Sequence, residues 1–179
     1  VPGLLAVTED SPPSTWDLAA AYALAVGCLF GGGFVTTFRQ ECVSDQFGEQ
    51  AVLCGGGIEL VKAAFDIMVE AGYGQENAYF ECVHELKLIT DLVHRYGVDG
   101  MRSRISGTAA YGGLTRGPRL IDDSVKEKMR TILTEIESGR FAEEFLAGHG
   151  DPENGIEALA RSEAAGPLAA AGREMLPRL

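Results

Sequence analysis

Apolar residues recur at helical spacing along most of the chain. In residues 121–138, one side of a helix would carry Val125, Met129, Ile132, Leu133 and Ile136. The same pattern, with glycine and proline as breaks, predicts further helices over residues 16–30, 45–54, 58–71, 76–96, 140–147 and 155–175. The sequence therefore predicts an all-α protein.

Few segments have the composition of a strand. Residues 4–7 form a short apolar run that suits one, and residues 34–43 are expected to be extended or irregular because of their threonines. The last predicted helix contains Gly166-Pro167, where a break is expected because proline cannot continue a helix.

Two pairs of acidic residues stand four positions apart on these predicted helices. Asp45 and Glu49 form the first pair, and Glu81 and Glu85 form the second. Residues at this spacing project from one side of a helix, one turn apart. Two carboxylates placed in this way repel each other unless a positive charge lies between them, and a hard divalent cation supplies one.

The apolar neighbours of the acids strengthen this interpretation. At about 100° per residue, Leu88 and Leu92 point in nearly the same direction as Glu81 and Glu85. A buried carboxylate must be paired, protonated or bound to metal. The alternative is that these helices border a surface groove, in which the carboxylates are simply hydrated.

Composition narrows the possible partners. The chain has 179 residues, of which 46% are hydrophobic, so a single domain over residues 1–179 is expected. Its net charge of −11 argues against a nucleic acid or an anionic membrane as partner. The four cysteines have no metal-binding spacing and no signal peptide is evident, so a cytoplasmic protein with reduced thiols is expected.

Other kinds of site have weaker support. The glycine runs at 31–33 and 55–57 lie between predicted helices, so neither is a dinucleotide-binding fingerprint. His84 points about 60–100° away from Glu81 and Glu85 on the same helix. It has either a direct role at the site or only a hydrogen bond on the helix face.

Four segments of the chain carry a resemblance to a known family. They are Thr36-Thr-Phe-Arg39, Asp45-Gln-Phe-Gly-Glu-Gln-Ala-Val-Leu-Cys-Gly-Gly56, Ala78-Tyr-Phe-Glu-Cys-Val-His-Glu-Leu-Lys-Leu-Ile89 and Gly117-Pro-Arg-Leu-Ile-Asp122. Together they resemble the C-terminal helical domain of ketol-acid reductoisomerase, over essentially the whole chain. That domain is helical and knotted, and this chain contains no counterpart of the family's NADPH-binding Rossmann domain.

The resemblance implies a function and a set of site residues. The family rearranges a 2-hydroxy-3-oxo acid by alkyl migration and then reduces the product with NADPH, using two Mg²⁺ ions. By resemblance, Asp45, Glu49, Glu81 and Glu85 are metal ligands, Glu81 and Glu85 are also the expected catalytic residues, and Ser106 contacts the substrate carboxylate. A homodimer is implied. Hydride transfer is not expected from this chain alone, because it has no NADPH site.

The chain also departs from the family pattern. Ala110 and Gly113 stand where the family has acids, as do Gln40 and Val43, and Ala160 and Gly166 replace basic and histidine positions. These changes leave the expected metal ligands and remove polar groups around them, so a larger or less polar ligand could fit.

Three hypotheses follow. The first is a domain of a ketol-acid reductoisomerase that binds an acetohydroxy acid through two Mg²⁺ ions. The second is a stand-alone homologue repurposed as a cofactor-independent isomerase or cyclase in specialised metabolism. The third is a non-catalytic scaffold, which four intact acids on apolar faces argue against.

Overall fold

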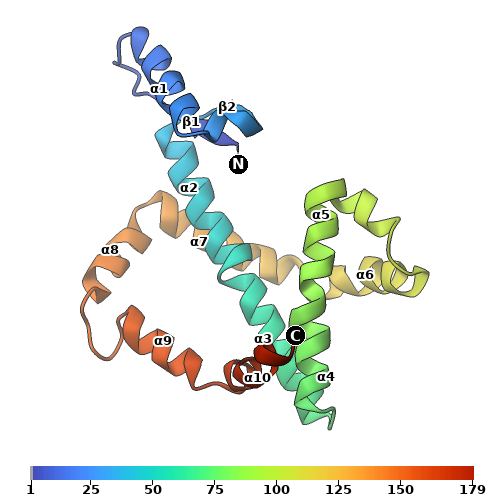
Figure 1. The fold of residues 1–179 in the computed structure, drawn as a ribbon. Helices are drawn as coiled ribbons and strands as arrows, with labels where there is room; N and C mark the ends of the chain where they lie inside the picture. The colour runs from blue at the N-terminus through green and yellow to red at the C-terminus, as the bar shows by residue number, and fades with distance from the viewer. Residues whose placement is uncertain (1) are drawn as a thin grey trace. The chain divides into compact units, whose positions relative to one another are not determined.

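The computed structural model describes residues 2–179 and consists almost entirely of helices, which confirms the all-α prediction (Figure 1). Val1, where the predicted domain begins, lies outside the described residues. Two compact units, Val1–Gln50 and Ala51–Leu179, divide the chain, and each is described here by itself.

The first unit contains a pair of short parallel strands. Strand β1 (Gly3–Leu5) pairs with β2 (Gly33–Val35) in a register that places Leu4 opposite Phe34. Helix α1 (Ser14–Ala25) and the 3₁₀ turn η1 (Cys28–Gly31) connect them. This connection is the short helical crossover that parallel strands require. The apolar run at residues 4–7 is thus partly a strand, and Phe34 and Val35 are extended as expected.

Helix α2 (Phe38–Gly48) begins earlier than the sequence suggested. Residues 34–43 were expected to be extended or irregular, and this is wrong from Phe38 onwards. The reason is a capping interaction, since the Thr37 side chain accepts a hydrogen bond from the backbone N–H of Gln40 at 3.1 Å. Threonine acts here as a helix cap rather than as a strand former.

The second unit is formed by a succession of helices. They are η2 (Glu49–Leu53, which starts at the end of the first unit), α3 (Gly56–Glu70), α4 (Gln75–Tyr79), η3 (Phe80–His84), α5 (Glu85–Arg102), α6 (Gly107–Leu120), α7 (Asp123–Glu137), α8 (Arg140–Gly148), α9 (Ile156–Ala164), α10 (Pro167–Met175) and η4 (Leu176–Arg178). The break expected at Gly166-Pro167 separates α9 from α10, so that prediction is confirmed.

The single helix predicted over residues 76–96 is divided in the structure. It is made of α4, the π-helical turn η3 and the first part of α5. Helix α5 bends at Gly97, whose φ of 72° lies in the left-handed region that favours glycine. After this bend the chain continues to Arg102, so the helical segment is longer than predicted.

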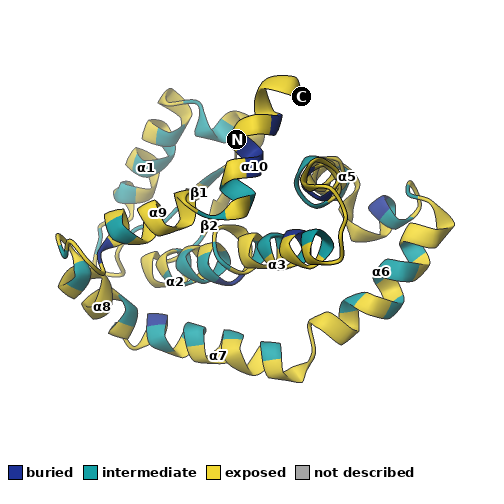
Figure 2. Ribbon diagram, turned by 90° about the horizontal axis from the view of Figure 1, so that it is seen from below, coloured by how far each residue is buried: buried dark blue, intermediate teal, exposed yellow. Residues whose placement is uncertain are grey.

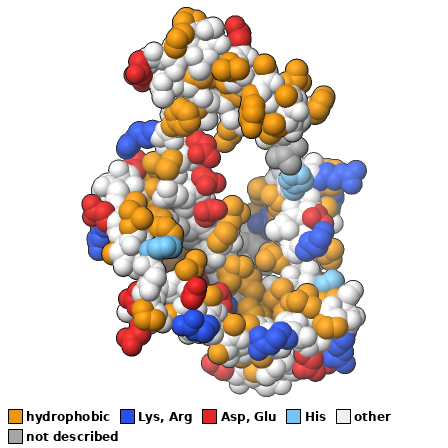
Figure 3. Space-filling model, turned by 60° about the vertical axis from the view of Figure 1, so that its left-hand side comes forward, with side chains coloured by type: hydrophobic (Ala, Val, Ile, Leu, Met, Phe, Trp, Pro, Cys, Tyr) orange, Lys and Arg blue, Asp and Glu red, His pale blue; other side chains and the backbone are white. Residues whose placement is uncertain are grey.

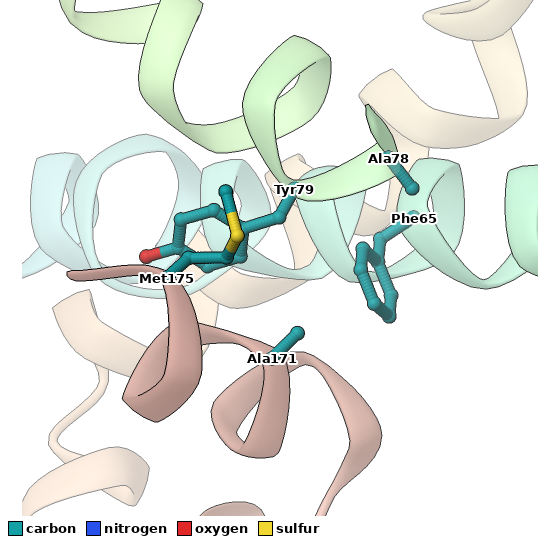
Figure 4. Close-up of a cluster of buried hydrophobic side chains, with 5 residues drawn as sticks. All are labelled: Phe65, Ala78, Tyr79, Ala171 and Met175. Carbon is teal, nitrogen blue, oxygen red and sulfur yellow. The ribbon is translucent and has the colours of Figure 1, made fainter. Parts of the chain in front are cut away.

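The core of the second unit is one small cluster of side chains. Phe65 from α3 is fully buried and packs with Ala78 and Tyr79 of α4 and with Ala171 and Met175 of α10 (Figure 4). A Cβ at residue 172 would lie 3.3 Å from the Tyr79 ring, so a glycine there lets α10 approach the ring closely. The cluster fixes α3, α4 and α10 together.

Most other apolar side chains remain exposed. Buried residues are sparse along the ribbon in Figure 2, and hydrophobic side chains are spread over the face seen in Figure 3. The accessible surface is 13160 Å² for 19.0 kDa, whereas a compact monomer of this mass exposes roughly 8,400 Å². The chain therefore exposes roughly 4,800 Å² more than a compact monomer of its mass.

Candidate functional site

Both acidic pairs coincide with π-helical turns. Glu49 is the first residue of η2 and follows α2, which carries Asp45. Glu81 lies within η3, and Glu85 begins α5 directly after it. A π turn widens the helix by one residue, is rare, and occurs frequently at functional sites. The same unusual backbone at both pairs sets them apart from the other acidic residues of these helices.

The glycine run after the first pair makes a sharp junction between η2 and α3. A Cβ on Gly56 would lie 2.2 Å from the carbonyl oxygen of Ala51, and one on Gly57 would lie 2.4 Å from that of Val52. Only glycine therefore fits against these two carbonyl groups. The run was predicted as an interruption between helices, and its physical role is to let the backbone turn directly after the π-helical segment.

All four acidic side chains are exposed. None of Asp45, Glu49, Glu81 and Glu85 takes part in a side-chain hydrogen bond or an ion pair within residues 2–179, whereas other acids, such as Glu59 and Glu76, do. Burial, and secondarily the negative charge of Glu81, raises the pKa of the Cys82 thiol. The four carboxylates are thus available to an external cation.

Most of the residues expected to be buried around the acids are exposed as well, although Leu92 is half-buried. Leu88 is 53% exposed, and Val52 and Leu53, which follow the first pair, are 55% and 66% exposed. The prediction that the acids lie among buried leucines is therefore wrong for the chain by itself. Carboxylates and leucines are exposed together instead.

The two pairs belong to different units. Asp45 and Glu49 end the first unit, while Glu81 and Glu85 lie in the second. Within each unit, over residues 2–179, no group of three or more histidine, cysteine, aspartate or glutamate side chains gathers into a metal-binding cluster. Each pair by itself offers two hard oxygen donors, which is the kind of ligand that Mg²⁺ prefers but fewer than a complete site needs.

Ser106 caps the N-terminus of α6. Its hydroxyl accepts a hydrogen bond from the backbone N–H of Ala109 at 3.2 Å and lies 3.0 Å from the hydroxyl of Thr108. The side chain is exposed. A hydroxyl at a helix N-terminus is well placed for contact with an anion, because the backbone N–H groups of the first turn also point outwards.

His84 has a neighbour that favours a structural role. Its ring stacks on Phe80, with the ring centroids 4.8 Å apart and an interplanar angle of 27°. The His84 side chain forms no hydrogen bond within residues 2–179, and a direct role at the site stays a prediction. The stacking holds the imidazole against the Phe80 ring on the side of η3.

The sequence analysis did not place a groove between α3, α9 and α10 of the second unit. A cavity of about 1000 Å³ opens between α3, α9 and α10, and Ala160 and Gly166 line it. Lys62 lies in the groove and donates hydrogen bonds to Glu59 and Glu163 at 2.6 Å each, and these bonds raise the pKa of the lysine. Two departures from the family pattern thus form part of one largely apolar surface.

No helix among the described residues combines the length and the apolar character needed to cross a membrane.

Comparison with known proteins agrees with the helical fold. The family described as "Ketol-acid reductoisomerase, C-terminal domain" matches residues 38–178. A solved structure of an NADH-preferring ketol-acid reductoisomerase from an uncultured archaean superposes with a TM-score of 0.91 at 39% identity. The match covers 98% of this chain and 53% of that one.

The fold thus defines a reductoisomerase-type helical domain. The chain belongs to the ketol-acid reductoisomerase family, to which it is related through that family's C-terminal domain. It spans about half the length of the solved relative.

Proposed function

We propose that this chain is a metal-dependent, substrate-binding domain of the isomerase type, which holds a 2-hydroxy-3-oxo acid through two Mg²⁺ ions. The observation that carries the proposal is the backbone at the acidic pairs together with the lack of side-chain partners for their carboxylates. Both stand at π-helical turns, and none of the four carboxylates is engaged by another side chain within residues 2–179. Membership of the reductoisomerase family supports the choice of substrate.

The donor set fits the metal. Asp45 and Glu49 would supply oxygen ligands at the first pair, and Glu81 and Glu85 at the second. When bound, the ions polarise the substrate carbonyl as Lewis acids. The chain's own residues orient the substrate, with the Ser106 hydroxyl and the first N–H groups of α6 facing its carboxylate. Hydride transfer is not assigned to this chain.

The proposal includes a second copy of the chain. The surface excess of roughly 4,800 Å² per chain is more than the roughly 1,000–2,500 Å² that each partner of an obligate dimer buries, so a second copy would cover part of it. Each acidic pair offers too few ligands for a complete site by itself, and a dimer could complete it with ligands from the partner. The exposed leucines beside the acids would then be covered.

A second candidate function rests on the departures from the family. Ala160 and Gly166 leave the groove of the second unit without the polar side chains of the family pattern. Gly113 replaces an acid, and the guanidinium of Arg102 lies where a side chain at residue 113 would begin. These changes favour an isomerase or cyclase without a nicotinamide cofactor and with a different substrate.

Titration calorimetry with Mg²⁺ tests the proposal. The purified chain is expected to bind Mg²⁺ saturably, and more tightly when a 2-hydroxy-3-oxo acid is present. Glu81→Gln should weaken binding about tenfold or more, since it removes one anionic ligand. Glu70→Gln is the matched control, because Glu70 is an exposed glutamate outside both pairs.

Two results would contradict the assignment. An Mg²⁺ affinity that is the same in Glu81→Gln and in the unmodified chain would remove Glu81 from the metal site. Binding of Mg²⁺ that the oxo acid does not tighten would leave a metal site but favour the second candidate function.

A further inference from the structure

One stretch of the chain has the opposite charge from the rest. The protein has 15 Lys and Arg against 26 Asp and Glu, yet residues 95–119 contain five arginines and a single acid, Asp99. The arginines are Arg95, Arg102, Arg104, Arg116 and Arg119. This stretch covers the end of α5 and nearly all of α6 in the second unit.

Within residues 2–179, none of these five arginines has a carboxylate partner. Elsewhere in the described residues, most cationic side chains are paired within 4.0 Å of an acid, as Lys62, Lys87, Lys126, Arg130, Arg140, Arg161 and Arg178 are. Asp99 lies in the same stretch but forms no ion pair within residues 2–179. The positive charge of this stretch is therefore not neutralised by neighbouring side chains.

Two of the guanidinium groups share one aromatic ring. The guanidinium carbon of Arg104 lies 3.9 Å from the centroid of the Tyr96 ring, and that of Arg95 lies 5.3 Å from it. Both positions are within the range of a cation–π contact. Both guanidinium groups therefore contact one ring, which places their carbons no more than 9.2 Å apart.

The local backbone holds Arg104 in this position. Its Nη1 donates to the carbonyl oxygen of Gly100 at 2.9 Å and to the hydroxyl of Ser103 at 3.1 Å. A Cβ on Gly100 would lie 2.7 Å from the Tyr96 side chain and 3.6 Å from Arg104, so the glycine leaves room for both. The guanidinium is fixed on one edge, and its other N–H groups remain free.

We propose that Arg95 and Arg104, held together by Tyr96, bind an oxyanion group of a small molecule, either a phosphate or a carboxylate. Two neighbouring guanidinium groups match a doubly charged oxyanion, and guanidinium N–H groups form charge-assisted hydrogen bonds with both kinds of group. Both side chains are exposed, so a ligand can reach them. This site is distinct from the proposed metal ligands and does not depend on them.

Calorimetric titration of the full chain tests this, first with sodium phosphate and then with sodium succinate, at constant ionic strength. Saturable binding is expected for at least one of the two. Arg95→Gln and Arg104→Gln should each weaken it about tenfold, the loss of one charge-assisted hydrogen-bonding group. Arg95→Gln is the safer variant, since Arg95 makes no hydrogen bond within the described residues and its loss spares the fold.

Two further variants serve as controls. Arg119→Gln removes the same charge from the same stretch without touching Tyr96, and it should leave binding unchanged. Tyr96→Phe keeps the ring that holds the two guanidinium groups, and it should also bind normally.

The outcomes separate the two sources of the oxyanion. Tighter binding of phosphate assigns a phosphorylated ligand, and tighter binding of succinate assigns a carboxylate. The proposal is overturned if neither compound binds saturably, or if Arg119→Gln weakens binding as much as Arg95→Gln does. Titration with Mg²⁺ alone remains a separate test of the metal site.

Discussion

The junction between η2 and α3 should not accept a side chain at residue 56. In Gly56→Ala, the new methyl group would lie 2.2 Å from the carbonyl oxygen of Ala51, whereas ordinary contacts begin at 3.4 Å. The opposing atom belongs to the backbone and cannot rotate away, so the chain itself must shift by more than about 1 Å. Overpacking of this kind costs about 1–3 kcal/mol, and the upper end applies here.

Part of this cost is recovered, because alanine favours a helix over glycine by about 1 kcal/mol. The net loss is therefore about 2 kcal/mol. With a urea dependence of about 1–3 kcal/mol per molar, the midpoint of unfolding should fall by about 1 M. Circular dichroism during urea titration, at one fixed protein concentration, measures this shift.

Gly112→Ala provides the matched control. Residue 112 lies inside α6, and a Cβ there would meet nothing within 4 Å. This variant should therefore gain about 0.5–1 kcal/mol from helix propensity alone. If Gly56→Ala unfolds at the same urea concentration as Gly112→Ala, the close approach of Ala51 does not constrain the junction and the reasoning fails.

Three further predictions concern the core, a helix cap and the second acidic pair. Phe65→Ala should cost about 3–5 kcal/mol, since Phe65 is fully buried, and a urea midpoint near that of the unmodified chain would contradict its place in the core. Hydrogen bonds from the hydroxyl of Ser124 and from the backbone N–H of Val125 lower the pKa of Asp122 below its ordinary value. This stabilisation is present above the unfolded pKa of about 3.9 and is lost as the pH falls through the lower folded pKa, so melting temperatures between pH 6 and 3 should fall more steeply than in Asp122→Asn. Glu85→Gln should slightly raise the melting temperature of the metal-free chain by relieving repulsion from Glu81, and a clear decrease would instead indicate a stabilising ion pair.

The sequence predicted the helical fold and the positions of both acidic pairs, because each rests on a spacing that a helix enforces. It did not predict the π-helical turns at Glu49 and Glu81. A π turn changes hydrogen bonding over only five residues, which is too short to alter the periodicity of apolar positions. The glycines at 55–57 were the available signal, but a glycine run indicates a break in a helix without showing which carbonyl groups approach it.

Burial was the least predictable property. Helical periodicity identifies an apolar face, as it did for Leu88 and Leu92, but not what covers that face. Leu88 remains 53% exposed in the chain by itself. A pattern of apolar positions is the same whether the cover comes from the same chain or from a second copy.

The small core around Phe65 also affects how the second unit moves. Resistance to local opening is concentrated in α3, α4 and α10, which supply the five buried residues of the cluster. Helices α6 to α9 contribute none of them, and their backbone hydrogen bonds are protected mainly by the helices themselves. Amide hydrogens in α6 to α9 would then exchange with solvent by fraying and local unfolding. Those beside Phe65 would exchange only when the whole unit unfolds. Arg116 and Arg119 on α6, and Ser106 at its N-terminus, thus lie in a part of the chain whose conformation a bound ligand can readily order.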